Sequence, residues 1–226
     1  MGDLQDRMPW NYCDYRCEVC RYQATCTVYH ASEAERRLLA IEGKDPDDPA
    51  VLVESVAKML SEVAENLKQD AARFGIDLDE AVKNAPVRDR DRKFGDDPLS
   101  RQVRDLTLRI SKFIRERGPD AQPQAHPRER VDAAWDDLIW YHTLMAAKTA
   151  RAVGGLDDAG DWPVESGMVP DYKVSAGIAL KCIHSCREAL QTLRPGLPGA
   201  EADVDSLIAA LDEARELVRA KFDRPF

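Results

Sequence analysis

The sequence of 226 residues predicts an all-α protein, an antiparallel helical bundle of about five long helices after a Cys-rich, mostly irregular N-terminal segment. Three observations lead to this prediction. Apolar residues recur every three or four positions from residue 32 onward. Capping residues, prolines and glycines interrupt that pattern at regular intervals. No run of alternating β-branched residues marks a strand, so we expect no sheet.

The first two helices are predicted from their start and stop signals. A short helix is expected over residues 32–43, because Ser32 and Glu35 form a capping-box pattern. A long helix is expected to begin at Pro49, with Asp48 as its N-cap, and to end at Gly75. Its apolar residues form an amphipathic stripe: Val53, Val56, Leu60, Val63, Leu67, Ala71 and Phe74.

A second short helix over residues 79–84 and a polar connector over residues 86–97 follow. The next long helix begins with the same cap-and-proline signal at Asp97 and Pro98, and three more long helices complete the chain. We expect the third of the five long helices to close at Gly154 and Gly155. The stripes of these four helices are Leu99, Val103, Leu106, Ile110 and Phe113; Val131, Trp135, Leu138, His142, Met145 and Thr149; Val174, Ile178, Cys182, Ile183, Cys186, Leu190 and Leu193; and Val204, Leu207, Ile208, Leu211, Ala214 and Val218.

The chain is predicted to divide into a Cys-rich metal-binding segment over residues 1–31 and one helical-bundle domain over residues 32–226. The net charge of -9 argues against binding to nucleic acid, since phosphate backbones repel an acidic chain. No apolar run approaches the roughly 18 residues of a membrane span, and no signal peptide is evident. We therefore expect a cytoplasmic protein, a compartment in which clustered cysteines indicate metal or redox chemistry.

Four of the six cysteines lie within fourteen residues, at Cys13, Cys17, Cys20 and Cys26. Thiolate sulfur is a soft ligand that suits both zinc and iron–sulfur clusters, and each of these centres commonly takes four ligands. Structural zinc sites usually join two distant ligand pairs, whereas this run is closer in style to bacterial ferredoxins. The spacing therefore favours one 4Fe-4S cluster, with zinc as the alternative. His30 is a possible alternative ligand if the metal is zinc.

The spacing of Cys13, Cys17 and Cys20 also resembles the C-x3-C-x2-C triad of radical S-adenosylmethionine enzymes. That resemblance would imply a β/α barrel, yet the pattern after residue 32 is helical throughout. Cys26 would also occupy the iron position that those enzymes leave open for their cofactor. We therefore do not assign the family and retain only the spacing, which is compatible with a cubane cluster.

His142, Cys182 and Cys186 are a second, weaker candidate for a metal site, because all three lie on predicted apolar stripes. The structural alternative is stronger for each of them. A buried cysteine usually packs as a small apolar residue, and a histidine on such a stripe is usually a hydrogen-bonded core residue.

The sequence favours a small metal-binding redox or accessory protein that acts on a protein partner. The alternative is a helical scaffold or adaptor with a structural zinc site held by four cysteines. An enzyme is not favoured, because no nucleotide-binding, hydrolase or metalloprotease motif occurs in the sequence. The apolar stripes are also compatible with the interface of a homodimer.

Overall fold

The structure is a computed structural model that describes residues 13–84, 96–119, 129–157, 169–222. Over these residues the chain is helical and contains no strand, which confirms the all-α class. Seven α-helices are described, with short 3-10 helices at Cys17–Val19 (η2) and Arg194–Gly196 (η6). The α-helices are α2 (Thr27–Ile41), α3 (Pro49–Arg73), α4 (Leu78–Asn84), α6 (Pro98–Arg117), α7 (Glu129–Asp157), α8 (Asp171–Leu193) and α9 (Glu201–Phe222).

The described residues fall into two units. Residues 15–84 form the N-terminal unit, with α2, α3 and α4. Residues 13–14 and 96–222 form the four-helix unit, with α6 to α9. The boundary predicted after residue 31 falls inside α2. The antiparallel arrangement of five long helices stays a prediction.

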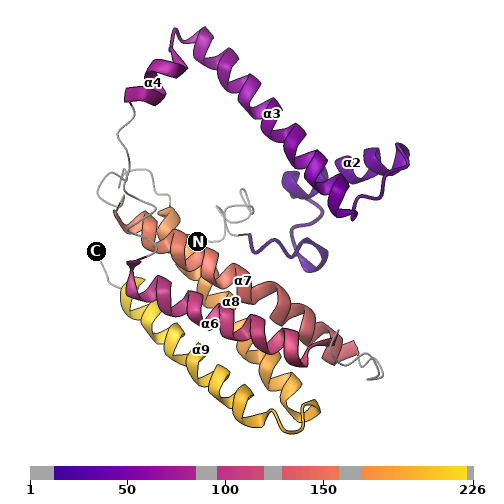
Figure 1. The fold of residues 1–226 in the computed structure, drawn as a ribbon, viewed down its shortest axis with the longest axis vertical. Helices are drawn as coiled ribbons and strands as arrows, with labels where there is room; N and C mark the ends of the chain where they lie inside the picture. The colour runs from indigo at the N-terminus through magenta and orange to yellow at the C-terminus, as the bar shows by residue number, and fades with distance from the viewer. Residues whose placement is uncertain (1–12, 85–95, 120–128, 158–168, 223–226) are drawn as a thin grey trace. The chain divides into compact units, whose positions relative to one another are not determined.

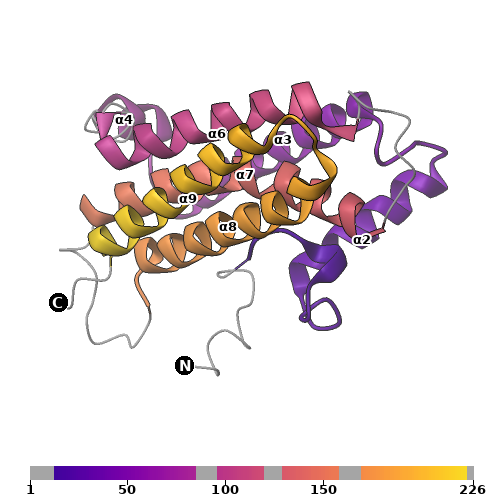
Figure 2. The ribbon, with the colours of Figure 1, turned by 90° about the horizontal axis from the view of Figure 1, so that it is seen from below.

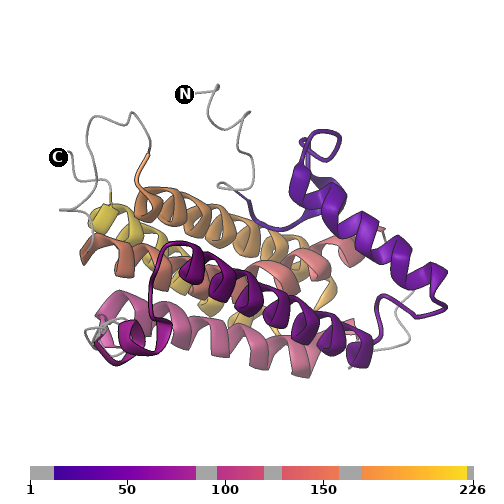
Figure 3. The same cartoon turned by 90° about the horizontal axis from the view of Figure 1, so that it is seen from above.

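The four-helix unit is built around one apolar core. Helices α6, α7, α8 and α9 lie side by side in all three views (Figures 1, 2 and 3), and α7 and α8 share the largest contact. The predicted stripes of these helices face that core. Its fully buried members include Val103, Ile110, Leu138, Met145, Cys182, Ile183, Cys186, Leu190, Val204, Leu211, Ala214 and Val218.

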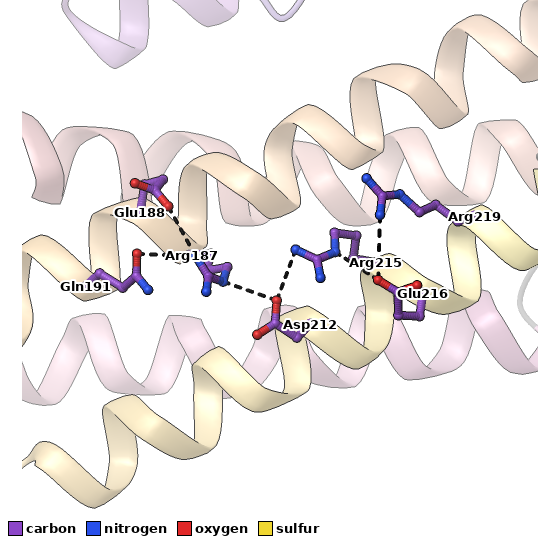
Figure 4. A network of polar contacts seen from close by, with 7 residues as sticks. All are labelled: Arg187, Glu188, Gln191, Asp212, Arg215, Glu216 and Arg219. Carbon is purple, nitrogen blue, oxygen red and sulfur yellow. Dashed lines mark hydrogen bonds and ion pairs between the residues drawn. The ribbon is translucent and has the colours of Figure 1, made fainter.

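Polar contacts along the surface join α8 to α9 (Figure 4). Arg187 on α8 donates to Asp212 on α9 over 3.1 Å, and Arg215 lies 3.3 Å from the same carboxylate. Arg219 and Glu216 extend the network along α9. Exposed ion pairs of this kind contribute about 0–1 kcal/mol each, so the core carries most of the stability of this unit.

Two helix starts were predicted correctly from local sequence. Asp48 caps α3, where its carboxylate accepts a hydrogen bond from the Ala50 N–H over 2.8 Å. Asp97 caps α6 and accepts from the N–H groups of Leu99 and Ser100 over 3.0 and 3.2 Å. In both helices proline occupies the first turn. Backbone N–H groups in the first turn have no partner within the helix, so a proline, which lacks an N–H, costs no hydrogen bond there.

The start of one helix and the end of another differ from the prediction. Helix α2 begins at Thr27 with Cys26 as its N-cap, so the capping-box pattern at Ser32 lies inside the helix. Helix α7 continues through Gly155 to Asp157. A Cβ atom at Gly155 would lie 2.8 Å from the Tyr172 Cβ, so this glycine allows α7 and α8 to approach closely and does not stop the helix.

The N-terminal unit has almost no core of its own. Cys26 and Ala71 are the only buried residues among its described members. The stripe predicted for α3 is present on the helix, but its large side chains are exposed; Leu60, for example, is 65% exposed. Ion pairs from Arg36 to Asp47 and from Lys44 to Glu54 bridge the turn between α2 and α3. Exposed ion pairs cannot substitute for a missing core.

None of the described helices has an apolar stretch long enough to cross a lipid bilayer.

Candidate functional site

The Cys-rich segment is built from one tight turn and the start of a helix. Cys17 opens η2, and the Cys20 N–H closes the turn by donating to the Cys17 carbonyl over 3.2 Å. The Gln23 side chain donates to the same carbonyl over 3.3 Å. The Cys26 N–H donates to the Tyr22 carbonyl over 2.9 Å, which places Cys26 at the entry to α2.

Exposure differs along this run of cysteines. Cys13, Cys17 and Cys20 are half-buried, whereas Cys26 is only 8% exposed. Cys26 is the N-cap of α2, but its side chain makes no capping hydrogen bond. Backbone N–H groups at a helix N-terminus stabilise negative charge, so this position suits a metal-bound thiolate.

Tyr15, between Cys13 and Cys17, has a left-handed backbone with φ of 61°. This conformation is uncommon for a residue with a Cβ atom and costs roughly 1–2 kcal/mol. The strain lies between the first two cysteines of the segment. Strained residues of this kind cluster at functional sites.

Asp14 is held in a polar cluster on the four-helix unit. It is 9% exposed, and its carboxylate accepts hydrogen bonds from the Tyr141 hydroxyl over 2.9 Å and from the Lys181 ammonium. The Trp140 indole N–H donates to the Asp14 carbonyl over 2.8 Å. Hydrogen bonds to charged groups contribute about 1.5–3 kcal/mol, so this cluster fixes the chain beside Cys13. Sequence patterns do not reveal this cluster, because the partners of Asp14 are more than a hundred positions away and no local pattern marks them.

Within the described part of the chain, no group of three or more His, Cys, Asp or Glu residues is arranged to hold a metal ion. The four N-terminal cysteines therefore do not form such a group, although Cys17 and Cys20 lie in one turn. His142, Cys182 and Cys186 also do not form such a group.

His30 lies exposed on the first turn of α2. Its Nε2 atom is 3.0 Å from the Ala24 carbonyl oxygen, and its ring meets Tyr29 edge to face. Since a carbonyl only accepts, this contact requires a hydrogen on Nε2.

His142 is a buried, hydrogen-bonded histidine of the four-helix unit. Its Nδ1 donates to the Leu138 carbonyl over 2.9 Å, and its Nε2 lies 3.0 Å from the Ser111 hydroxyl on α6. Both contacts fit a neutral ring. Burial lowers the pKa of His142 below its usual value, although the backbone hydrogen bonds act in the opposite direction.

Cys182 and Cys186 are fully buried in the core. Burial raises the pKa of the Cys182 thiol to about 12, with a further contribution from the Asp14 carboxylate. Burial also raises the pKa of Cys186. Both thiols are therefore protonated at neutral pH, whereas a metal ligand must lose its proton. Their environment is that of small apolar core residues.

We expect the four-helix unit to lose stability in acid because of His142. The unfolded chain takes up a proton on this ring near pH 6.5, whereas the folded protein resists protonation. Stability is therefore fully present above about pH 6.5 and falls as the pH drops from there toward the lower folded pKa. Urea unfolding at about pH 7.5 and about pH 5.5 measures the loss. A His142→Asn variant should show a smaller loss; an equal loss in both proteins would contradict the assignment.

An open cavity of about 200 Å³ lies between α6 and α9, lined by Arg109, Lys112, Phe113, Glu116, Asp203, Ser206 and Leu207. Ligand pockets usually measure about 300–1,000 Å³, so this cavity is small for an organic ligand. Its charged side chains are of both signs, and Arg109 already donates to the Ser206 hydroxyl over 2.9 Å.

No protein family, no curated protein sequence and no solved structure matches this chain. The candidate site therefore depends on the residues and their local geometry alone.

Proposed function

We propose that Cys13, Cys17, Cys20 and Cys26 bind one 4Fe-4S cluster, and that the protein is a small redox or accessory partner of another protein. The observation that carries the proposal is the local structure of the segment. One 3-10 turn links Cys17 to Cys20, and Cys26 stands at the N-terminus of a helix. Cys13 lies four positions before Cys17 and completes the set of four thiols that such a cluster needs.

The energetics of the N-terminal unit support a metal centre. Ordering a residue costs roughly 1–2 kcal/mol of backbone entropy, which apolar burial normally offsets. This unit buries only Cys26 and Ala71 among its described residues, so its own packing cannot offset that cost. Metal binding to a cysteine cluster supplies about 10 kcal/mol or more in small zinc domains. A bound metal would therefore stabilise a segment that lacks other support.

The acidic chain indicates the kind of partner. With a net charge of -9, long-range attraction favours a basic protein surface and disfavours nucleic acid. The segment contains the tyrosines Tyr15, Tyr22 and Tyr29, whose rings would limit the access of water to a cluster.

A structural zinc site is the second candidate, and the orientation of His30 favours it. Histidine ligands commonly donate their other ring N–H to a backbone carbonyl, and His30 does so toward Ala24. Its Nδ1 atom would then be the ligating nitrogen. In this case the protein is a scaffold or adaptor without catalytic activity, and the metal serves only to fold the segment.

Visible absorption of anaerobically purified protein tests the proposal. We expect a brown protein whose colour bleaches with dithionite, and we expect the Cys17→Ser variant to be colourless. The Cys182→Ala variant is the matched control, because it removes a thiol outside the segment and should keep the colour. A colourless wild-type protein with about one zinc per chain would support the scaffold instead. Colour that survives the Cys17→Ser substitution would contradict the ligand assignment.

A further inference from the structure

Helix α3 carries an apolar face that the described residues of its own unit leave exposed. When the helix is projected down its axis at 100° per residue, seven large side chains fall within a band roughly 120° wide. They are between 48 and 70% exposed: Leu52, Val53, Val56, Met59, Leu60, Val63 and Leu67. We refer to these seven residues as the α3 face. An exposed apolar patch of this size usually marks an interaction surface.

The spacing within the α3 face is that of a helix-pairing seam. From Val53 to Leu67 its central residues alternate between three- and four-residue steps, which is the heptad repeat of coiled coils. Ala57 and Ala64 border the seam at the same heptad position, and their small side chains allow a second helix to come close. No charged residue interrupts the seam between Val53 and Leu67.

We propose that the α3 face binds the α3 face of a second copy of this chain. A heptad seam fits another helix with the same repeat, and an identical helix provides it. Since the face is uncharged, two copies of an acidic chain can meet there without burying like charges. This inference does not depend on the metal centre.

The area of the α3 face is sufficient for a homodimer. A fully exposed side chain of this size presents roughly 150 Å² to water, so the seven side chains, at 48–70% exposure, supply roughly 600 Å² per copy. Two copies would bury roughly 1,200 Å², above the roughly 1,000 Å² expected of a specific interface. Homodimer interfaces are also richer in apolar area than other interfaces, as this face is.

The four-helix unit offers no matching stripe. Among its described residues the exposed large apolar side chains are Leu108, Ile139, Trp140 and Leu217, on three different helices. These are single positions or direct neighbours in sequence, without the three- and four-residue spacing of a seam. A second copy of α3 is therefore the better-fitting occupant.

Light scattering after size exclusion tests the proposal on the full-length protein. We expect the wild-type protein to have twice the chain mass of 25.3 kDa, and the Leu60→Glu variant to have the mass of one chain. The Ser61→Glu variant is the matched control, since it adds the same charge one residue further along the chain, on the side of the helix away from the seam. It should stay dimeric. A monomeric wild-type protein, or a dimeric Leu60→Glu variant, would overturn the proposal.

A mixing experiment separates lost pairing from lost folding. Leu60 lies at the middle of the seam, so the two copies of position 60 are neighbours whether the helices run parallel or antiparallel. We expect Leu60→Glu and Leu60→Lys to be monomers alone and to form a heterodimer when mixed. If the mixture stays monomeric while both variants keep their helical circular dichroism, the proposal is wrong. The metal content of each variant should equal that of the wild-type protein. Loss of the dimer is then distinguished from loss of the metal.

Discussion

Replacing Cys20 by serine is expected to release the metal and to unfold α2. The N-terminal unit buries only two described residues, so the proposed metal would be the main support of the segment that leads into α2. Hydrogen exchange measured by mass spectrometry follows the amides of Thr27–Ile41 directly. We expect their protection to fall by at least about 100-fold, which corresponds to about 2.7 kcal/mol.

The same experiment contains its own controls. Protection within α6 to α9 should stay unchanged in the Cys20→Ser variant, because that unit has a separate core. Chelation of the metal from the wild-type protein should reproduce the loss in α2, whereas the Cys182→Ala variant should not. If α2 is equally protected with and without metal, the segment is not folded by a metal centre.

Truncating Leu106 to alanine is expected to destabilise the four-helix unit by about 2–5 kcal/mol. Leu106 is 3% exposed and packs in the shared core of α6 to α9, so the substitution removes buried methyl groups and leaves a cavity. Leu108 lies two residues further along the same helix but is 61% exposed. Its truncation should change stability by less than about 0.5 kcal/mol.

Urea unfolding of the two variants beside the wild type measures both values under the same conditions. The pair is matched in residue type, helix and helix propensity, so the difference reports burial alone. Similar losses for Leu106→Ala and Leu108→Ala would mean that α6 does not present the face described here.

The features that the sequence predicts well are those set by neighbouring residues. Asp48 with Pro49 and Asp97 with Pro98 each mark a helix start, and both caps form with the expected hydrogen bonds. The core stripes of α6 to α9 also follow from spacing alone, because each helix buries one face.

Two other helix boundaries differ from the prediction. Ser32 and Glu35 match a capping box, yet α2 had already begun at Thr27, and a pattern inside a helix cannot act as its cap. Gly155 reads as a helix stop, but its role is to let α7 approach Tyr172 on α8. The approach of Gly155 to Tyr172 joins two helices, so residues near Gly155 in the sequence do not reveal it.

The metal site stays a prediction. The cysteine spacing indicates a metal site, and the turn at Cys17 to Cys20 gives two of these residues a defined local geometry. The cluster of Asp14 with Tyr141, Lys181 and Trp140 was not predicted, because nothing near Asp14 in the sequence identifies its partners. A similar limit applies to α3, whose stripe predicts an apolar face but not what covers it.

Iron, zinc and acid-labile sulfide content of anaerobically purified protein is the most direct test of the metal-centre proposal. We predict about four irons and about four sulfides per chain, as one cubane cluster requires. If the protein contains zinc and no sulfide, the same cysteines hold a structural zinc ion and not a cluster. A folded protein that contains neither iron, sulfide nor zinc would contradict the account, because the four thiols would then serve no metal.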